Sequence, residues 1–165
     1  MELTPKPLTA KAFASYGEVV DINSANKKFS MNYGLATRYY DLAEVDVEDE
    51  GGKTCISIVK SGAVVFPFMV EKMEYHPLGS QLFYPLCESP FLVLVSTPVE
   101  VLDTTKLELF ISDGKQGVNY HKGVWHHYLM PINEGVNQFI VVDRNGNDEN
   151  CIETQITEEI TISFV

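Results

Sequence analysis

All four histidines of this 165-residue chain fall in two short segments. His76 lies in the segment 74–81, which reads Glu-Tyr-His-Pro-Leu-Gly-Ser-Gln. The other three lie in 117–127, which reads Gly-Val-Asn-Tyr-His-Lys-Gly-Val-Trp-His-His. Histidine is the side chain best suited to proton transfer and metal binding near neutral pH. The two segments are therefore the first candidates for a functional site.

The first segment holds an imidazole, a carboxylate and an amide that a β-hairpin can bring together. Side chains alternate faces along a strand, so Glu74 and His76 are expected to point the same way. A tight turn through 77–80 would return Gln81 to the side of His76. Such nitrogen and oxygen donors suit a borderline divalent metal ion. The same groups could instead hydrogen-bond a polar ligand, or lie solvated on a surface strand.

The second segment is denser in histidine than core packing requires. If 124–130 is a strand, His126 and His127 point to opposite faces, and one of them can be an ordinary hydrogen-bonded histidine. His121 lies across a turn at 122–123, and strands on either side of that turn would let it approach His126. The pattern favours a functional site that includes His121 and His126.

Short strands separated by turn signals predict an all-β domain. Dipeptides such as Asp113-Gly114 and Asn145-Gly146 mark the turns. The one helical signal covers 9–16, with Thr9 as its cap and Gly17 after its end. Short strands without helices between them indicate a sandwich or barrel. The strands expected are 17–22, 54–60, 64–68, 72–76, 81–85, 91–96, 107–111, 118–121, 124–130, 138–143 and, as one or two strands, 151–164, with a loop at 24–30 and no assignment for 31–42.

The composition describes one ordinary globular domain and excludes some partners. Hydrophobic residues make up 45% and charged residues 21%, and the length of 165 residues predicts a single domain. The net charge of -11 argues against nucleic acid and anionic membranes, which need clustered Lys and Arg. An anionic substrate would need a local positive site, either a metal ion or a buried Arg.

The cysteines and the N-terminal segment indicate a cytoplasmic protein. Cys55, Cys87 and Cys151 are odd in number and widely spaced, so neither a disulfide framework nor a zinc knuckle is expected. No basic segment followed by an apolar run opens the sequence, so no signal peptide is expected. The most apolar window, 63–70, is short and interrupted by Pro67, which argues against a membrane span.

Two histidine-bearing strand pairs in a small β-barrel are typical of the cupin superfamily. The second cupin motif, Gly-x-x-His, is present at 123–126. In the first motif, Glu74 stands where a histidine is usual, and Gln81 where a glutamate is usual. Over most of its length the chain further resembles the ureidoglycolate lyase family, in the segments 32–43, 74–81, 117–121 with 124–127, and 142–144.

The resemblance implies a fold, an assembly and a reaction. The fold is an all-β, cupin-like double-stranded β-helix, a jelly-roll barrel with a short N-terminal helix, formed by 1–165 as one domain. The assembly is a homodimer. The reaction is cleavage of (S)-ureidoglycolate to glyoxylate and urea, in allantoin and purine nitrogen catabolism. A divalent metal ion, with nickel as the suggestion, is implied as a cofactor, and no organic cofactor is expected.

The reaction assigns roles to the candidate residues. The substrate hydroxyl must lose a proton, and the leaving urea nitrogen must gain one. We expect Glu74, His76, Gln81 and His126 to hold the metal, and His121 or His126 to act as the base. Glu74 can donate the second proton if burial raises its pKa.

Substrate binding is assigned to two arginines and two aromatic residues. Arg38 and Arg144 are candidates because a guanidinium group binds a carboxylate through two parallel hydrogen bonds. Each could instead be a surface arginine paired with a nearby aspartate. Tyr120 and Trp125 are further candidates, although aromatic residues more often pack in the core.

Two other functions use the same residues. A non-catalytic cupin could bind a small hydroxy acid in the same pocket without turnover. A metal-dependent cupin oxygenase or isomerase would need more histidine ligands than Glu74 and Gln81 leave in the first motif.

Overall fold

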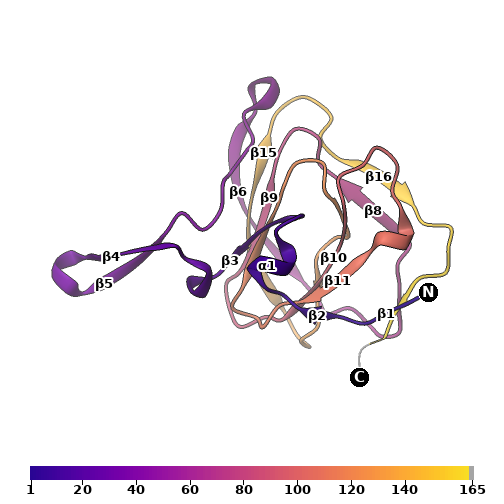
Figure 1. Cartoon of the computed structure of the whole chain (residues 1–165), viewed down its shortest axis with the longest axis horizontal. Coiled ribbons are helices and arrows are strands. Elements are labelled where there is room, and N and C mark those ends of the chain that lie inside the picture. Colours follow the sequence, from indigo (N-terminus) through magenta and orange to yellow (C-terminus); the bar gives the residue numbers. More distant parts are fainter. Residues whose placement is uncertain (164–165) are drawn as a thin grey trace.

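The computed structural model describes residues 1–163, and most of its regular structure is β-strand (Figure 1). A five-stranded sheet runs in the order β3 (Gly17–Val20), β12 (Gly117–Tyr120), β9 (Gln81–Pro85), β15 (Asn137–Asn145) and β6 (Lys53–Ser61). A seven-stranded sheet runs in the order β16 (Ile152–Gln155), β8 (Lys72–Tyr75), β13 (Trp125–His126), β10 (Phe91–Ser96), β11 (Glu108–Ile111) and β2 (Lys6–Pro7), with β14 (Met130–Pro131) paired to β10. The chain crosses repeatedly from one sheet to the other, and the two sheets form the expected jelly-roll barrel.

Smaller elements flank the two main sheets. A three-stranded sheet contains β1 (Glu2–Leu3), β17 (Thr161–Ile162) and β7 (Phe68–Met69). A separate hairpin contains β4 (Lys27–Met31) and β5 (Ala36–Tyr40), and Figure 1 shows it projecting away from the barrel. The helical elements are α1 (Ala10–Phe13) and the 3₁₀ turns η1 (Ile22–Ser24), η2 (Asn32–Gly34), η3 (Asp49–Gly51) and η4 (Thr104–Lys106).

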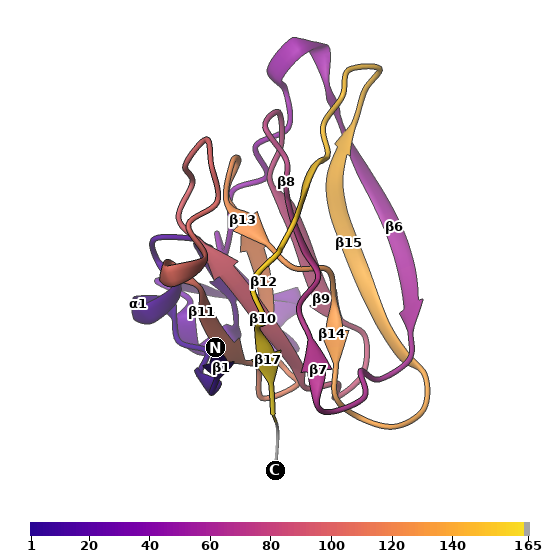
Figure 2. The ribbon, with the colours of Figure 1, turned by 90° about the vertical axis from the view of Figure 1, so that its right-hand side faces the viewer.

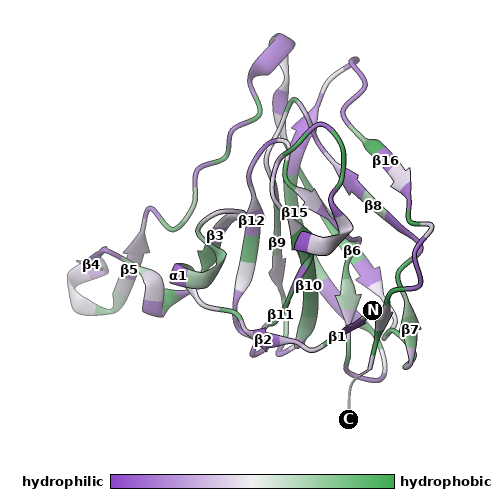
Figure 3. Cartoon of the chain, turned by 45° about the vertical axis from the view of Figure 1, so that its right-hand side comes forward, coloured by the Kyte–Doolittle hydropathy of each residue, from purple (hydrophilic) through white to green (hydrophobic). Residues whose placement is uncertain are grey.

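Strand β10 is buried on both faces because it lies between two hydrophobic clusters. Its alternate side chains Phe91, Val93 and Val95 enter the cluster between the main sheets. Leu92 and Leu94 enter the second cluster, on the outer side of the seven-stranded sheet, which the segment containing β17 covers. Figure 3 shows the apolar residues concentrated on the strands inside the barrel.

The predicted helix and its cap are present in shortened form. The Thr9 hydroxyl oxygen accepts a hydrogen bond from the Ala12 amide at 3.2 Å, and α1 ends at Phe13. Gly17 then begins β3 with φ of 156°, and a Cβ atom there would lie 1.9 Å from the Asn119 carbonyl oxygen. Glycine is therefore required where β3 begins its antiparallel pairing with β12, which explains the break after the helix.

Most predicted strands are confirmed, and 81–85 and 91–96 have the predicted bounds. The loop predicted at 24–30 is wrong, because Lys27–Met31 forms β4 by pairing with β5. The single strand predicted at 124–130 is also wrong. It divides into β13 and β14, which pair with opposite ends of β10. The segment 64–68 is mostly irregular, and 151–164 gives β16 and β17, with Phe164 outside the described residues.

The cysteines are unpaired, and the helical elements are short. Cys55, Cys87 and Cys151 all have free thiols. Within 1–163, no helix has the length and apolar character needed to cross a membrane.

We predict that Phe110→Ala lowers the free energy of unfolding by about 3–5 kcal/mol, because it removes a large side chain from the core between the sheets. Phe110 is fully buried, and its ring packs against Phe13 and Tyr16 with centroid distances of 5.6 and 6.1 Å. Urea unfolding measures the change. Val101→Ala is the control, because Val101 is 78% exposed and its loss should change stability by less than about 0.5 kcal/mol. Equal effects of the two substitutions would contradict this account of the core.

Candidate metal centre and active site

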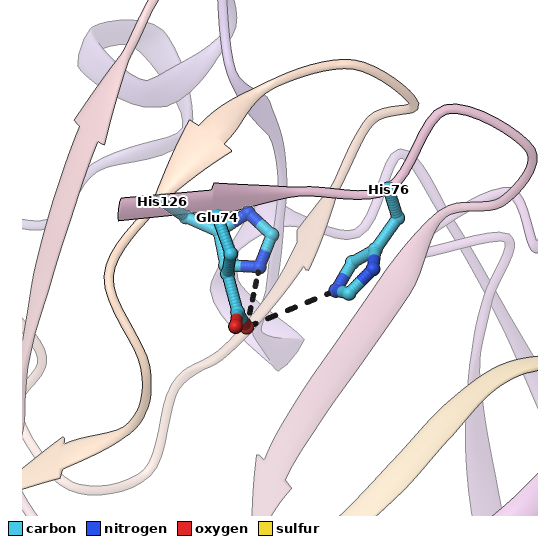
Figure 4. Close-up of side chains that lie close together, drawn as sticks. All are labelled: Glu74, His76 and His126. Carbon is cyan, nitrogen blue, oxygen red and sulfur yellow. Dashed lines mark ion pairs between the residues drawn. The ribbon is translucent and has the colours of Figure 1, made fainter. Parts of the chain in front are cut away.

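Three side chains from neighbouring strands of the seven-stranded sheet converge inside the barrel (Figure 4). Glu74 on β8 lies directly opposite His126 on β13, and His76 follows two residues after Glu74. The Glu74 Oε1 atom lies 3.5 Å from His126 Nε2 and 3.9 Å from His76 Nε2. Metal–ligand bonds of about 2.1 Å place two ligand atoms on one ion up to about 4 Å apart. The spacing therefore suits one shared ion.

Backbone carbonyl groups orient both imidazole rings. The Nδ1 atom of His76 lies 2.5 Å from the Asn150 carbonyl oxygen, and Nδ1 of His126 lies 2.9 Å from that of Val124. A carbonyl oxygen only accepts, so each Nδ1 carries the hydrogen and each Nε2 presents a lone pair. This is the arrangement that protein carbonyls impose on metal-binding histidines.

The buried acceptor atoms of the cluster lack hydrogen-bond partners within the described residues. These atoms are Nε2 of His76, Nε2 of His126 and Oε1 of Gln81, at the start of β9. Buried polar atoms without partners are costly, and a cation would satisfy all three. Gln81 and His76 line one cavity of about 250 Å³. With Glu74 and His126, these two residues make up the four-residue donor set predicted from the sequence, and this set fits a divalent metal ion.

The charge states of the cluster suit ligation. The close approach of the His126 ring, with its Nε2 atom 3.5 Å from Oε1, is the main reason that the pKa of Glu74 is lowered, so its carboxylate is ionised at neutral pH. Burial, followed by repulsion from His126, lowers the pKa of His76, so that ring is neutral. Burial alone raises the pKa of Glu74, but the neighbouring imidazoles lower it more, so the condition for Glu74 to act as a proton donor is not met. An ionised Glu74 suits ligation of a cation better than proton donation.

Of the two aromatic candidates, only Tyr120 touches the cluster. Its ring stacks on that of His126, with the centroids 4.3 Å apart and the planes 9° from parallel. Trp125 packs on Tyr75 in the outer hydrophobic cluster, and its Nε1 donates to the Val99 carbonyl oxygen at 2.8 Å. Tyr120 supports a ligand ring from the core side, whereas Trp125 has a packing role.

The structure does not bring His121 or His127 into the cluster. Since Tyr120 faces His126, the next residue, His121, faces the other side of its strand. Its Nε2 lies 3.1 Å from Glu18 Oε2, in a second cavity of about 200 Å³ that Ser80 also lines. His127 is buried against Phe68, and burial lowers its pKa to about 4. His127 is thus a neutral core residue, while His121 is half exposed.

Arg144 is a buried structural residue at the wall of the cavity. Its guanidinium group donates to the carbonyl oxygens of Asp49 and Glu50 and to the Asp148 carboxylate, at 2.9 to 3.4 Å. Pairing with a nearby aspartate, here Asp148, was the alternative to substrate binding that the sequence left open for Arg144. Three glycines make room for this side chain, since a Cβ atom on any of them would lie within 2.9 Å of it; they are Gly52, Gly79 and Gly146.

Arg38 lies outside the site of its own chain. It belongs to β5 in the projecting hairpin, and its guanidinium group lies over the Tyr40 ring, 5.0 Å from the centroid. Figure 1 shows that the hairpin extends away from the barrel. Contacts within one chain therefore do not make Arg38 a substrate-binding residue.

Two positioning residues were missed from the sequence. Asn150 holds His76 through its carbonyl oxygen, and its side-chain oxygen accepts from the Leu78 amide at 2.7 Å. Ser80 exchanges two hydrogen bonds with the backbone of Asp46, at 2.8 and 2.9 Å. Ser80 stood inside the first histidine segment, but Asn150 lies in a polar loop where no local pattern marks it.

The fold and the site define this chain as a cupin, a jelly-roll barrel that holds histidine and carboxylate ligands inside. A family model described as ureidoglycolate lyase matches residues 1–163, and the chain belongs to that family. A ureidoglycolate lyase from Burkholderia mallei (strain NCTC 10229) is 43% identical over 161 residues, covering 98% of this chain and 93% of that protein. One from Pseudomonas syringae pv. tomato is 40% identical over 156 residues, covering 94% of this chain and 91% of that protein. One from Pseudomonas putida (strain W619) is 42% identical over 154 residues, covering 93% of this chain and 91% of that protein.

A solved structure gives a more distant likeness. RmlC from Streptococcus suis, in complex with dTDP-D-xylose, aligns with a TM-score of 0.44 and 8% identity, over 58% of this chain and 46% of that chain. The strand pairing described above, and not this partial match, is the basis of the fold assignment.

We predict that Arg144→Ala lowers the free energy of unfolding by roughly 1–3 kcal/mol, because it leaves the carbonyl oxygens that Arg144 satisfies without their donor. Urea unfolding measures the loss. Lys11→Ala is the control, since Lys11 is exposed on α1. If Arg144→Ala were as stable as the control and only raised KM, Arg144 would be a substrate-binding residue after all.

Proposed function

We propose that this protein cleaves (S)-ureidoglycolate to glyoxylate and urea. Family membership supports the reaction, and the three unpartnered acceptor atoms beside an ionised Glu74 support a site built for it. The reaction fits allantoin catabolism, and three free thiols fit a cytoplasmic location.

The reaction needs two proton transfers and no water. The substrate hydroxyl loses its proton, and the O–H bonding pair forms the carbonyl group of glyoxylate. The C–N bond breaks, and its electron pair leaves with the urea nitrogen, which then gains a proton. A group with a pKa near the working pH performs such transfers best, and histidine is the natural choice.

We assign the metal to Glu74, His76, Gln81 and His126. Bound there, a divalent ion, with nickel as the candidate that the family resemblance suggests, supplies positive charge that binds the substrate carboxylate and lowers the pKa of its hydroxyl group. The chain itself contributes the two imidazoles, the ionised carboxylate and the strands that hold them.

We assign proton transfer to His121, the histidine that neither the metal cluster nor the core takes. Its Nε2 lies 3.1 Å from Glu18 Oε2, and this pairing leaves Nδ1 available. A carboxylate that orients one imidazole nitrogen while the other acts is a common catalytic arrangement. Ser80 lines both the His121 cavity and the cavity beside the cluster, so the two lie next to each other.

The function is tested by glyoxylate release from racemic ureidoglycolate, with the spontaneous rate subtracted. We expect chelator treatment to abolish turnover and a divalent ion to restore it. Turnover that is indifferent to chelator would keep the lyase and remove the metal from it. No turnover above background would leave a non-catalytic cupin that binds a small hydroxy acid.

Two single substitutions separate the metal centre from proton transfer. His126→Ala is expected to lose stoichiometric binding of Ni²⁺, because it removes a buried ligand atom. His121→Asn is expected to keep that binding and to lose about 10²–10⁴-fold in kcat. Titration calorimetry and the glyoxylate assay measure the two effects. If His121→Asn turned over normally, His121 would not be the proton-transfer group.

A further inference from the structure

The hairpin of residues 27–40, here called the arm, has an apolar surface that no other described part of the chain covers. Its strands β4 and β5 pair only with each other, as a two-stranded sheet. A lone two-stranded hairpin is marginally stable in water. Large apolar side chains are nevertheless exposed on it; they are Phe29, Met31, Tyr33, Leu35, Tyr39 and Tyr40.

A second apolar surface lies on the outer face of the five-stranded sheet. On β15, Phe139 and Val141 enter the core, so Ile140 and Val142 between them face outward. The residues paired with these two on β6 are Ile58 and Ile56, which are 63% and 72% exposed. Those paired on β9 are Tyr84 and Leu82.

This outer face is unusual for a solvent-exposed sheet. An open antiparallel sheet normally shows polar residues to water, and a continuous apolar patch marks an interface. Strand β6 is also the edge of its sheet, nine residues long, in the part of the chain that the structure describes. Figure 2 shows β6 and β15 side by side along one flank of the barrel. Edge strands of this kind are ordinarily covered.

Charge indicates that a second copy of the chain is the occupant. The arm contains Lys27, Lys28 and Arg38 and no acidic residue, whereas the whole chain has a net charge of -11. The rest of the chain therefore carries -14, and the segment 41–50 that follows the arm contains six acidic residues. A basic arm is attracted to such a body, and a twofold pair would cover both arms and both outer faces at once.

The site lacks a free cationic side chain for the substrate carboxylate. Among the residues lining the two cavities, Arg144 is bound by carbonyl oxygens and Asp148, and Lys122 by Asp46 and Asp49 at 2.9 and 2.7 Å. Arg38 lies on the exposed arm, and within residues 1–163 the contact of its guanidinium group is with the Tyr40 ring, 5.0 Å from the centroid. A carboxylate-bearing substrate therefore lacks an arginine partner within one copy.

The cavity adjoins the apolar sheet edge. Asp143 and Arg144 line it, and their partners on β6 are Cys55 and Thr54. A partner that covers this end of β6 therefore also lies beside the cavity. We propose that two copies pair through the arm and the outer sheet face, and that each arm places Arg38 at the cavity of the other copy, where it binds the substrate carboxylate. The role of Arg38 rests on the proposed lyase function.

A mixed dimer tests the proposal. Arg38→Ala is expected to raise KM about tenfold or more, because it removes the guanidinium group that binds the substrate carboxylate through two hydrogen bonds. Arg38→Lys is expected to recover part of the loss, because it keeps the positive charge. His126→Ala is expected to be inactive. The two variants, carrying different affinity tags, are coexpressed, and the mixed species is purified through both tags. If Arg38 acts across the interface, the mixed dimer has one intact site, with the wild-type KM and about half the wild-type kcat per dimer.

Each other outcome overturns a defined part of the proposal. A mixed dimer whose working site keeps the raised KM of Arg38→Ala means that Arg38 acts within its own chain, and normal kinetics of Arg38→Ala mean that it does not bind substrate. If the wild type itself is inactive, the lyase function and the role of Arg38 fall together, and sedimentation still decides the pairing.

Sedimentation isolates the interface from catalysis. The wild type is expected to be a dimer, and Ile56→Asp combined with Ile58→Asp a folded monomer, as judged by circular dichroism. Val101→Asp is the matched control, because Val101 is comparably exposed (78%) and follows β10 of the other main sheet. A monomeric wild type, or a dimer that the Ile56 and Ile58 substitutions leave intact, overturns the pairing.

Discussion

The register between β8 and β13 fixes the chemistry of this protein. One pairing sets His126 opposite Glu74, and the alternation of side chains then puts His76 on the same face. A shift of one residue would turn these groups away from each other and bring apolar neighbours inward. Strand β10, buried on both faces and paired with β13, holds that register. The hydrophobic core and the metal-binding geometry therefore depend on the same strand pairing.

The cluster is rigid because each ring is fixed through the backbone. Carbonyl oxygens of Asn150 and Val124 hold the two Nδ1 atoms, and Tyr120 stacks against one ring. Side-chain partners could rotate, but these carbonyl groups belong to the strands and loops themselves. A site prepared in this way has little freedom to lose on binding an ion.

The parts of the site that the sequence predicts are those that depend on local geometry. Alternation along one strand and a tight turn are enough to bring together Glu74, His76 and Gln81. The position of His121 depends on which of two adjacent residues faces inward, and here Tyr120 takes that place. The buried position of the Arg144 side chain depends on three glycines from separate segments, which leave space for it. No local sequence pattern could therefore identify that position. The hairpin of β4 and β5 was missed because its exposed strands lack the alternation that a buried face imposes.

The strongly negative charge of the chain constrains how an anionic substrate can be held. At -11, the body repels a carboxylate, and the cationic side chains beside the cavity are already neutralised by their own partners. In the proposed function, the positive charge would come from groups added to a single chain, namely an ion in the cluster and a guanidinium group from a second copy. A divalent ion bound by two imidazoles and one carboxylate would keep a net positive charge, whereas one bound by several carboxylates would lose it. The Gln81 amide, in place of the usual glutamate, follows the same logic, because it offers an oxygen ligand without adding another negative charge.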